Sequence, residues 1–210
     1  MLFNSIAFFI FFPLVTAGYF IVPHRYRWIW LLVASFYFYM AFVPQYILIL
    51  LAVIAVDYSM GRLIEQTHGH KRELFLIVSI LANCGILFFF KYFNFFNNNL
   101  ALVTHLLRWN YSLQALKIIL PIGLSFHTFQ SMSYIIEVYK GKQVAERHLG
   151  IFALYVLFYP QLVAGPIERP QNMLHQFREH HAFDYARIVE GLKLRIIRNS
   201  TNIIHTVYPP

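Results

Sequence analysis

Long apolar runs recur along the chain, and short polar stretches separate them. A helix needs about 20 mostly apolar residues to cross the hydrocarbon core of a bilayer. The pattern therefore predicts an all-α, polytopic transmembrane protein with about five spans. The predicted spans are 5–22, 28–42, 46–64, 73–96 and 118–139. The predicted connections are a basic turn at 23–27, polar loops at 66–72 and 140–148, and a short interfacial helix over 97–117.

The apolar stretch that follows residue 148 is short, and its end is rich in proline and glycine. If 149–165 crossed the membrane, the basic stretch 166–198 would lie outside, although Lys and Arg are usually concentrated in the cytoplasm. We therefore expect 149–165 to be a re-entrant segment that lines a cavity, and a sixth full span is the alternative. Amphipathic helices on the inner membrane face are predicted at 171–181 and 184–198.

One predicted span carries an unusual number of polar side chains. On a helix over 118–139 they share one face, within an arc of roughly 120°. They are His127, Gln130, Ser131, Tyr134 and Glu137. A charged group at the centre of a membrane helix costs about 2.5–3.5 kcal/mol, so this stripe should face protein or water and is a candidate site.

Two further features of this span bear on its role. Pro121 and Gly123 predict a broken start to the helix, which is tolerated where the backbone lines a cavity. His127 has two interpretations: it lines a funnel and binds substrate, or it packs by a hydrogen bond to Gln130, Tyr134 or a neighbouring helix.

Composition supports the membrane assignment. Hydrophobic residues make up 59% of the chain and charged residues only 12%, against about 25% charged residues in soluble domains. The net charge of +8 is explained by basic cytoplasmic loops, and no basic cluster interleaved with exposed aromatics indicates nucleic-acid binding.

The distribution of Lys and Arg predicts the orientation of the chain in the membrane. One side holds Arg25, Arg27, Arg62, Lys71, Arg72, Lys140, Lys142 and Arg147. The other side holds Lys91, Arg108 and Lys117. We therefore expect a multi-pass protein of the inner or plasma membrane with its N-terminus outside.

Isolated polar residues elsewhere give weaker indications. Asp57 lies in the third span, and Arg62 is roughly 140° away around the helix, so the two are not a natural pair. We expect a local partner for Asp57, or contact with the interface, in preference to a proton relay. Cys84 is predicted to be a small core residue, and His68 and His70 alone do not predict a metal site.

Three segments carry a resemblance to a known family. They are LPIGLSFHTFQSMSYIIEVYKG at 120–141, FYPQLVAGPIERP at 158–170 and DYARIVEGLKL at 184–194. Together they resemble the membrane-bound O-acyltransferase family, specifically its alginate O-acetyltransferase-like branch, over 1–194. The resemblance implies a multi-span enzyme that moves an acyl group onto hydroxyls of an extracytoplasmic polysaccharide. It also implies a funnel between helices and an essential histidine in a Trp-Arg-Arg-Trp-His-like segment.

The resemblance guides the choice of site residues. The candidates for lining the funnel are His127, Gln130, Ser131, Tyr134, Glu137, Gln161, Gly165, Pro166 and Glu168. No bound cofactor is implied; the acyl donor, of acyl-CoA or acyl-carrier type, is a substrate. The implied partners are the bilayer, the polysaccharide acceptor and periplasmic or membrane proteins of the same pathway.

The last residues depart from the family pattern. No Trp-Arg-Arg-Trp-His-like segment occurs, and 195–210 diverges from the further apolar spans that the family would have. We therefore expect 1–194 to be the N-terminal portion of one acyltransferase domain, and 195–210 to reflect truncation or a frameshift. Such a chain would lack the catalytic histidine and be inactive alone.

Two other functions remain open at this stage. A transporter or channel subunit would also have a polar stripe and broken helices, although the chain shows no internal repeat. An inactive fragment that binds a full-length paralogue through its membrane helices is the other.

Overall fold

The computed structural model describes residues 5–41, 44–106, 123–161, 168–185 and 189–191. The chain divides into two compact units, 1–179 and 180–210, and all named elements lie in the first. They are α1 (Ile6–Ile21), α2 (His24–Met40), η1 (Pro44–Tyr46), α3 (Ile47–Gln66), α4 (His70–Leu106), α5 (Leu124–Tyr139), α6 (Leu149–Leu157) and α7 (Pro170–Met173). Every regular element in the described residues is helical, which confirms the all-α class.

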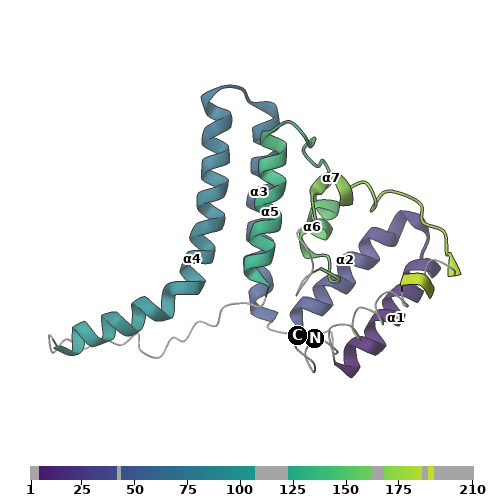
Figure 1. Ribbon diagram of the computed structural model, residues 1–210, viewed down its shortest axis with the longest axis horizontal. Coiled ribbons are helices and arrows are strands. Elements are labelled where there is room, and N and C mark those ends of the chain that lie inside the picture. The colour runs from purple at the N-terminus through teal and green to yellow at the C-terminus, as the bar shows by residue number, and fades with distance from the viewer. Residues whose placement is uncertain (1–4, 42–43, 107–122, 162–167, 186–188, 192–210) are drawn as a thin grey trace, which may run out of the picture. The chain divides into compact units, whose positions relative to one another are not determined.

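Three long helices form the part of the fold that positions the polar stripe. Helices α3, α4 and α5 contact one another in all three pairings, and Figure 1 shows them side by side. Helix α1 packs on α2, and α2 packs on α6. Helix α6 also contacts α3 and α5, so it joins the three-helix group to α2.

Two described helices are long and apolar enough to cross a bilayer. They are α3 and the part of α4 over His70–Phe93, and α1 is a shorter apolar helix. Only 11% of the apolar window in α4 is buried by protein, as expected of a helix that faces lipid. These two helices agree with the predicted membrane protein.

Helix α4 differs from the sequence prediction at its second half. A break was expected before Asn97, but the helix continues to Leu106, and Figure 1 shows that it bends along its length. The Asn99 amide donates to the Phe95 carbonyl oxygen at 2.7 Å, so this polar side chain is accommodated without ending the helix. Cys84, predicted to be a core residue, is exposed on α4.

The predicted basic turn at 23–27 is helical instead. Helix α2 begins at His24, directly after Pro23, whose fixed φ suits the first turn of a helix. Arg27 is almost fully buried, because its guanidinium lies 4.9 Å from the centroid of the Tyr19 ring and its Nε donates to the Val22 carbonyl at 3.2 Å. These contacts allow the basic side chain of Arg27 to be buried in the first turn of α2.

The segment after residue 148 forms a short buried helix. Helix α6 has nine residues, which at 1.5 Å each extend only about 13 Å of the roughly 30 Å hydrocarbon core. Its residues 151–157 are all buried, as expected for a helix that is apolar on every side. Helix α6 alone is therefore too short to cross a bilayer.

One predicted interfacial helix is wrong, and the other is mostly outside the described residues. The stretch 171–181 forms only the short helix α7, followed by turns up to Glu179. The Leu174 and Gln176 amides donate to carbonyl oxygens three or four residues back, in turns rather than in a continuous helix. The second prediction, 184–198, falls largely among residues that the structure does not describe.

The helix ends that carry the basic stretches meet at one end of the fold. The Arg72 guanidinium, at the start of α4, donates to the carbonyl of Tyr139, the last residue of α5, at 2.5 Å. The Trp28 ring on α2 lies 4.6 Å from the ring of His148. The stretches 23–27, 62–72 and 140–147 therefore lie at the same end, as expected if they share one side of the membrane.

Candidate functional site

The polar stripe of α5 faces the protein interior. His127, Gln130, Ser131 and Tyr134 have no solvent exposure, and Glu137 is partly buried. Phe129, on the opposite side of the helix, is 49% exposed. Protein therefore covers most of the stripe, as a face that should not contact lipid requires.

The start of α5 also fits the sequence expectation. Gly123 adopts a left-handed backbone conformation with φ of 82° immediately before Leu124. This conformation is readily accessible only to glycine, and α5 begins directly after it. Pro121, the other residue expected at this break, lies outside the described residues.

His127 is held by a neighbouring helix. Its Nδ1 lies 2.8 Å from the Val156 carbonyl oxygen in α6. A carbonyl oxygen can only accept, so Nδ1 carries the proton. This is the packing contact that the sequence left open.

Several polar atoms around His127 are buried and have no hydrogen-bond partner in the described part of the chain. They are Nε2 of His127, both amide atoms of Gln130 and the hydroxyl of Tyr39. The Tyr39 ring lies 5.8 Å from the His127 ring, so α2 and α5 contribute to one neighbourhood. Each buried polar atom without a partner costs about 1–3 kcal/mol, which makes this cluster energetically expensive.

A second polar group lies between α3, α4 and α5. The Asp57 carboxylate on α3 accepts from Ser79 Oγ at 2.6 Å and from Asn83 Nδ2 at 2.8 and 2.9 Å. It also accepts from the hydroxyl of Ser131, a member of the α5 stripe. Asp57 has no solvent exposure, so three helices are joined through one buried carboxylate.

Asp57 therefore has hydrogen-bond partners, as expected, but they come from α4 and α5 and are not local in the sequence. None of the ion pairs found among the described residues involves Asp57, in agreement with the helical spacing of Arg62. Two of its partners, Ser79 and Asn83, were missed from the sequence. Their spacing of four residues within an otherwise apolar run places both on one face of α4 and could have identified them.

The stripe also lies close to residues on the far side of the stretch 160–168, which holds the other funnel candidates. The Tyr155 hydroxyl, on α6, donates to the Glu168 carbonyl at 3.0 Å and lies 3.5 Å from the Gln130 carbonyl. The Gln171 amide donates to the Glu137 carboxylate at 2.6 Å. The two stretches that the sequence proposed as parts of one site are therefore adjacent where the structure describes both.

Of the three other funnel candidates in this stretch, the structure describes only Gln161. Gln161 is partly buried, and its Oε1 is buried with no partner in the described residues. Gly165 and Pro166 lie outside the described residues. Their role in lining the funnel remains a prediction.

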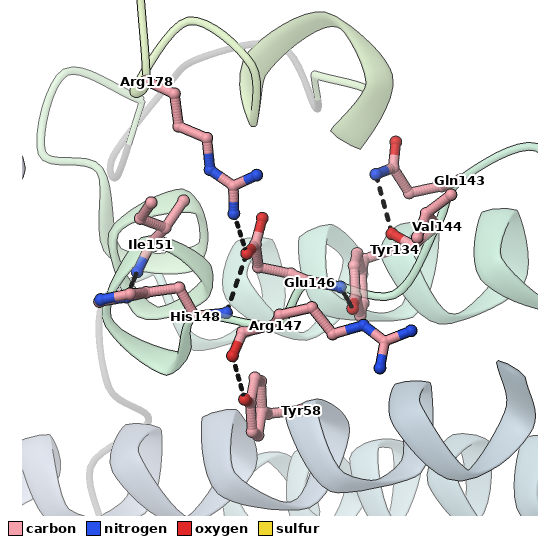
Figure 2. Close-up of polar contacts among 9 residues, drawn as sticks. All are labelled: Tyr58, Tyr134, Gln143, Val144, Glu146, Arg147, His148, Ile151 and Arg178. Carbon is pink, nitrogen blue, oxygen red and sulfur yellow. Dashed lines mark hydrogen bonds and ion pairs between the residues drawn. The ribbon is translucent and has the colours of Figure 1, made fainter. Parts of the chain in front are cut away.

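A buried carboxylate that the sequence did not indicate orders the 140–148 loop. Glu146 accepts from the His148 amide at 2.9 Å and pairs with the Arg178 guanidinium, while its own amide donates to the Tyr134 hydroxyl at 2.8 Å. Figure 2 shows Glu146 between Tyr134 and Arg178. The end of the α5 stripe is thereby fixed to the loop that follows it.

The same loop is attached to α3 on its other side. The Tyr58 hydroxyl donates to the Arg147 carbonyl at 2.7 Å, and the Arg147 guanidinium pairs with Glu65 at 2.8 Å. This second pair is largely exposed and so contributes little to stability.

Comparisons with known proteins identify relatives that cover most of this chain. The peptidoglycan O-acetyltransferase of Helicobacter pylori is 32% identical, with 91% of this chain and 42% of that protein covered. The probable alginate O-acetylase AlgI of Pseudomonas aeruginosa is 34% identical, with 91% of this chain and 37% of that protein covered. The corresponding protein of Azotobacter vinelandii is also 34% identical, with 91% and 38% covered.

The similarity covers only part of each relative. The chain spans about two fifths of the length of the curated relatives that it matches. No protein-family model and no solved structure matches it. The resemblance to polysaccharide O-acyltransferases that the sequence motifs carry is confirmed.

Proposed function

We propose that this chain is part of a membrane-bound O-acyltransferase that transfers acetyl or another acyl group to hydroxyls of an extracytoplasmic polysaccharide. The relatives are named for acetyl transfer to peptidoglycan and alginate. The observation that carries the proposal is the buried polar stripe of α5, which lies in one of the segments that resemble the family. Residues 1–194 would form the N-terminal portion of the acyltransferase domain and of its fold.

The chemistry of acyl transfer explains why such a stripe would be needed. A base must accept the proton of the attacking hydroxyl, and hydrogen-bond donors must stabilise the oxyanion that forms. The site must also limit access of water, which would otherwise hydrolyse the acyl donor. The α5 stripe and the stretch 160–168 would form one wall of this site, and the base would be the family's histidine, whose segment is not among these 210 residues.

The proposed membrane arrangement separates the two substrates. The chain would lie in the inner or plasma membrane with about five spans, a re-entrant segment at 149–165 and the N-terminus outside. An acyl-CoA or acyl-carrier donor would approach from the side of the basic loops, and the polysaccharide from the opposite side. Periplasmic or membrane proteins of the same pathway would act on the acceptor side.

A chimeric enzyme tests this function. Residues 1–194 would replace the matched portion of the Helicobacter pylori enzyme, and O-acetylation of peptidoglycan would be measured in a strain lacking the native protein. We expect the chimera to acetylate peptidoglycan and Gln130→Leu to reduce acetylation at least about tenfold, since about 1.4 kcal/mol of lost interaction is a tenfold change in rate.

Phe129→Leu is the matched control, because Phe129 adjoins Gln130 on α5 but is exposed. It should retain acetylation close to that of the parent chimera. Membrane levels of each chimera would be compared by immunoblot. Full acetylation by a well-expressed Gln130→Leu chimera would refute a role of the stripe in transfer.

A further inference from the structure

The neighbourhood of His127 contains the strongest unexplained feature of the molecule. Tyr39, His127 and Gln130 together present a hydroxyl, a ring nitrogen and both atoms of an amide, all buried and without partners in the described residues. Tyr39 is 2% exposed, and the other two are fully buried. Buried polar groups in proteins are nearly always satisfied by protein or by ordered water, so these atoms indicate a further hydrogen-bonding group.

The geometry of His127 restricts what that group can be. Because Nδ1 donates to the Val156 carbonyl, the Nε2 of a neutral ring is an acceptor. Its partner must therefore be a donor, which excludes a bare carbonyl or ester oxygen. Tyr39 and Gln130 each provide both a donor and an acceptor.

We propose that Tyr39, His127 and Gln130 form a buried binding site for an O–H group, which donates to His127 Nε2 and accepts from both the Tyr39 hydroxyl and the Gln130 amide. An O–H group both donates and accepts, whereas an ammonium only donates and would bring a charge into the membrane. The O–H belongs either to water or to the hydroxyl of the acyl acceptor. Only the second source rests on the proposed function.

The sign of a stability change tests the site without any acyl transfer. Tyr39→Phe removes one oxygen, and the midpoint of thermal unfolding would be followed by tryptophan fluorescence of the full chain in detergent. If an O–H group partners Tyr39, we expect the midpoint to fall by about 2–4 °C. Tyr37→Phe, on the same helix but 54% exposed, should change it by no more than about 1 °C.

An unchanged or higher midpoint for Tyr39→Phe would overturn the proposal, because removing a polar atom that truly lacks a partner relieves its desolvation penalty. A Gln130→Met variant provides a second test on α5. It should also lower the midpoint, whereas a rise would contradict the site.

Cysteine labelling distinguishes the two sources of the O–H group. In a Cys84→Ala background, Gln130→Cys would be treated with a small water-soluble thiosulfonate, with and without alginate oligosaccharides. Ile135→Cys, also on α5 and fully buried, is the control and should not react. Failure of Gln130→Cys to react would exclude an acceptor hydroxyl that enters from solvent and assign the O–H group to an enclosed water.

Reaction that the oligosaccharide slows at least about threefold, on the scale of 0.6 kcal/mol of binding, would assign the hydroxyl to the acceptor. Reaction that the oligosaccharide does not slow would assign the group to water. The second result, together with an active chimera, would preserve acyl transfer and place the acceptor elsewhere. An inactive chimera with a protected Gln130→Cys would instead leave this site established and refute the proposed reaction.

Discussion

At the level of single residues, Asp57 is a fully buried acid that needs hydrogen-bond donors from its surroundings. A carboxylate within a membrane helix bundle is stable only if its oxygens are well hydrogen-bonded. Asp57 meets this condition through Ser79, Asn83 and Ser131. Since Ser131 belongs to the α5 stripe, the carboxylate also fixes the rotation of α5 and hence the direction of its neighbours on the stripe.

Ser79→Ala should therefore destabilise the protein measurably. A hydrogen bond to a charged group contributes about 1.5–3 kcal/mol in general, whereas hydrogen bonds between membrane helices average about 0.6 kcal/mol. We expect the free energy of unfolding in mixed detergent to fall by about 1–2 kcal/mol, because Asp57 loses one of its donors. Denaturant titration of the purified chain measures this change.

Ser59→Ala is the control for that substitution. Ser59 is exposed on α3, and its hydroxyl donates only to the Ala55 carbonyl of its own helix at 2.7 Å. Its removal should change the free energy of unfolding by less than about 0.5 kcal/mol. Equal effects of the two substitutions would mean that the bond between Ser79 and Asp57 does not stabilise the bundle.

At the level of elements, helical periodicity predicted which segments are helices better than it predicted where they end. The third span agrees closely with α3, because apolar spacing determines that helix. In the first turn of α2, the basic side chain of Arg27 is buried against the Tyr19 ring. Such contacts join different helices and are not encoded in the local pattern, so 23–27 was predicted as a turn.

Close packing of α6 on α2 gives a prediction at this scale. A Cβ atom on Gly150 would lie 2.3 Å from Cζ3 of Trp28, closer than any ordinary contact. The ring is rigid and also packs against His148, so it has little freedom to move. We expect Gly150→Ala to lower the free energy of unfolding by about 1–3 kcal/mol through overpacking.

Gly85→Ala should have the opposite effect. Gly85 lies in the interior of α4, and a Cβ atom there would have nothing within 4 Å. Alanine favours a helix over glycine by about 0.5–1 kcal/mol, so this variant should be as stable as the parent or more stable. Thermal unfolding of both variants in one detergent compares them, and a stable Gly150→Ala variant would contradict the packing of α6 on α2.

At the level of the whole molecule, the sequence predicted the stripe but not what surrounds it. One helix contains the complete spacing of His127, Gln130 and Ser131, so its face could be derived from periodicity alone. The groups that complete the neighbourhood come from other helices, such as Tyr39 on α2 and Asn83 on α4. Their positions depend on long-range packing, which the pattern of one segment does not specify.

The orientation of the chain in the membrane is the broadest prediction and can be tested on one helix. Pro44 and His68 flank the two ends of α3, and both are exposed. Because basic loops face the cytoplasm, in a Cys84→Ala background a membrane-impermeant maleimide should label Pro44→Cys in intact spheroplasts. It should label His68→Cys only after the membrane is permeabilised.

Lys142→Cys should behave like His68→Cys, since Arg72 brings the two loops to the same end of the bundle. The reverse pattern would invert the proposed approach of donor and acceptor, and labelling of both α3 positions from one side would show that α3 does not cross.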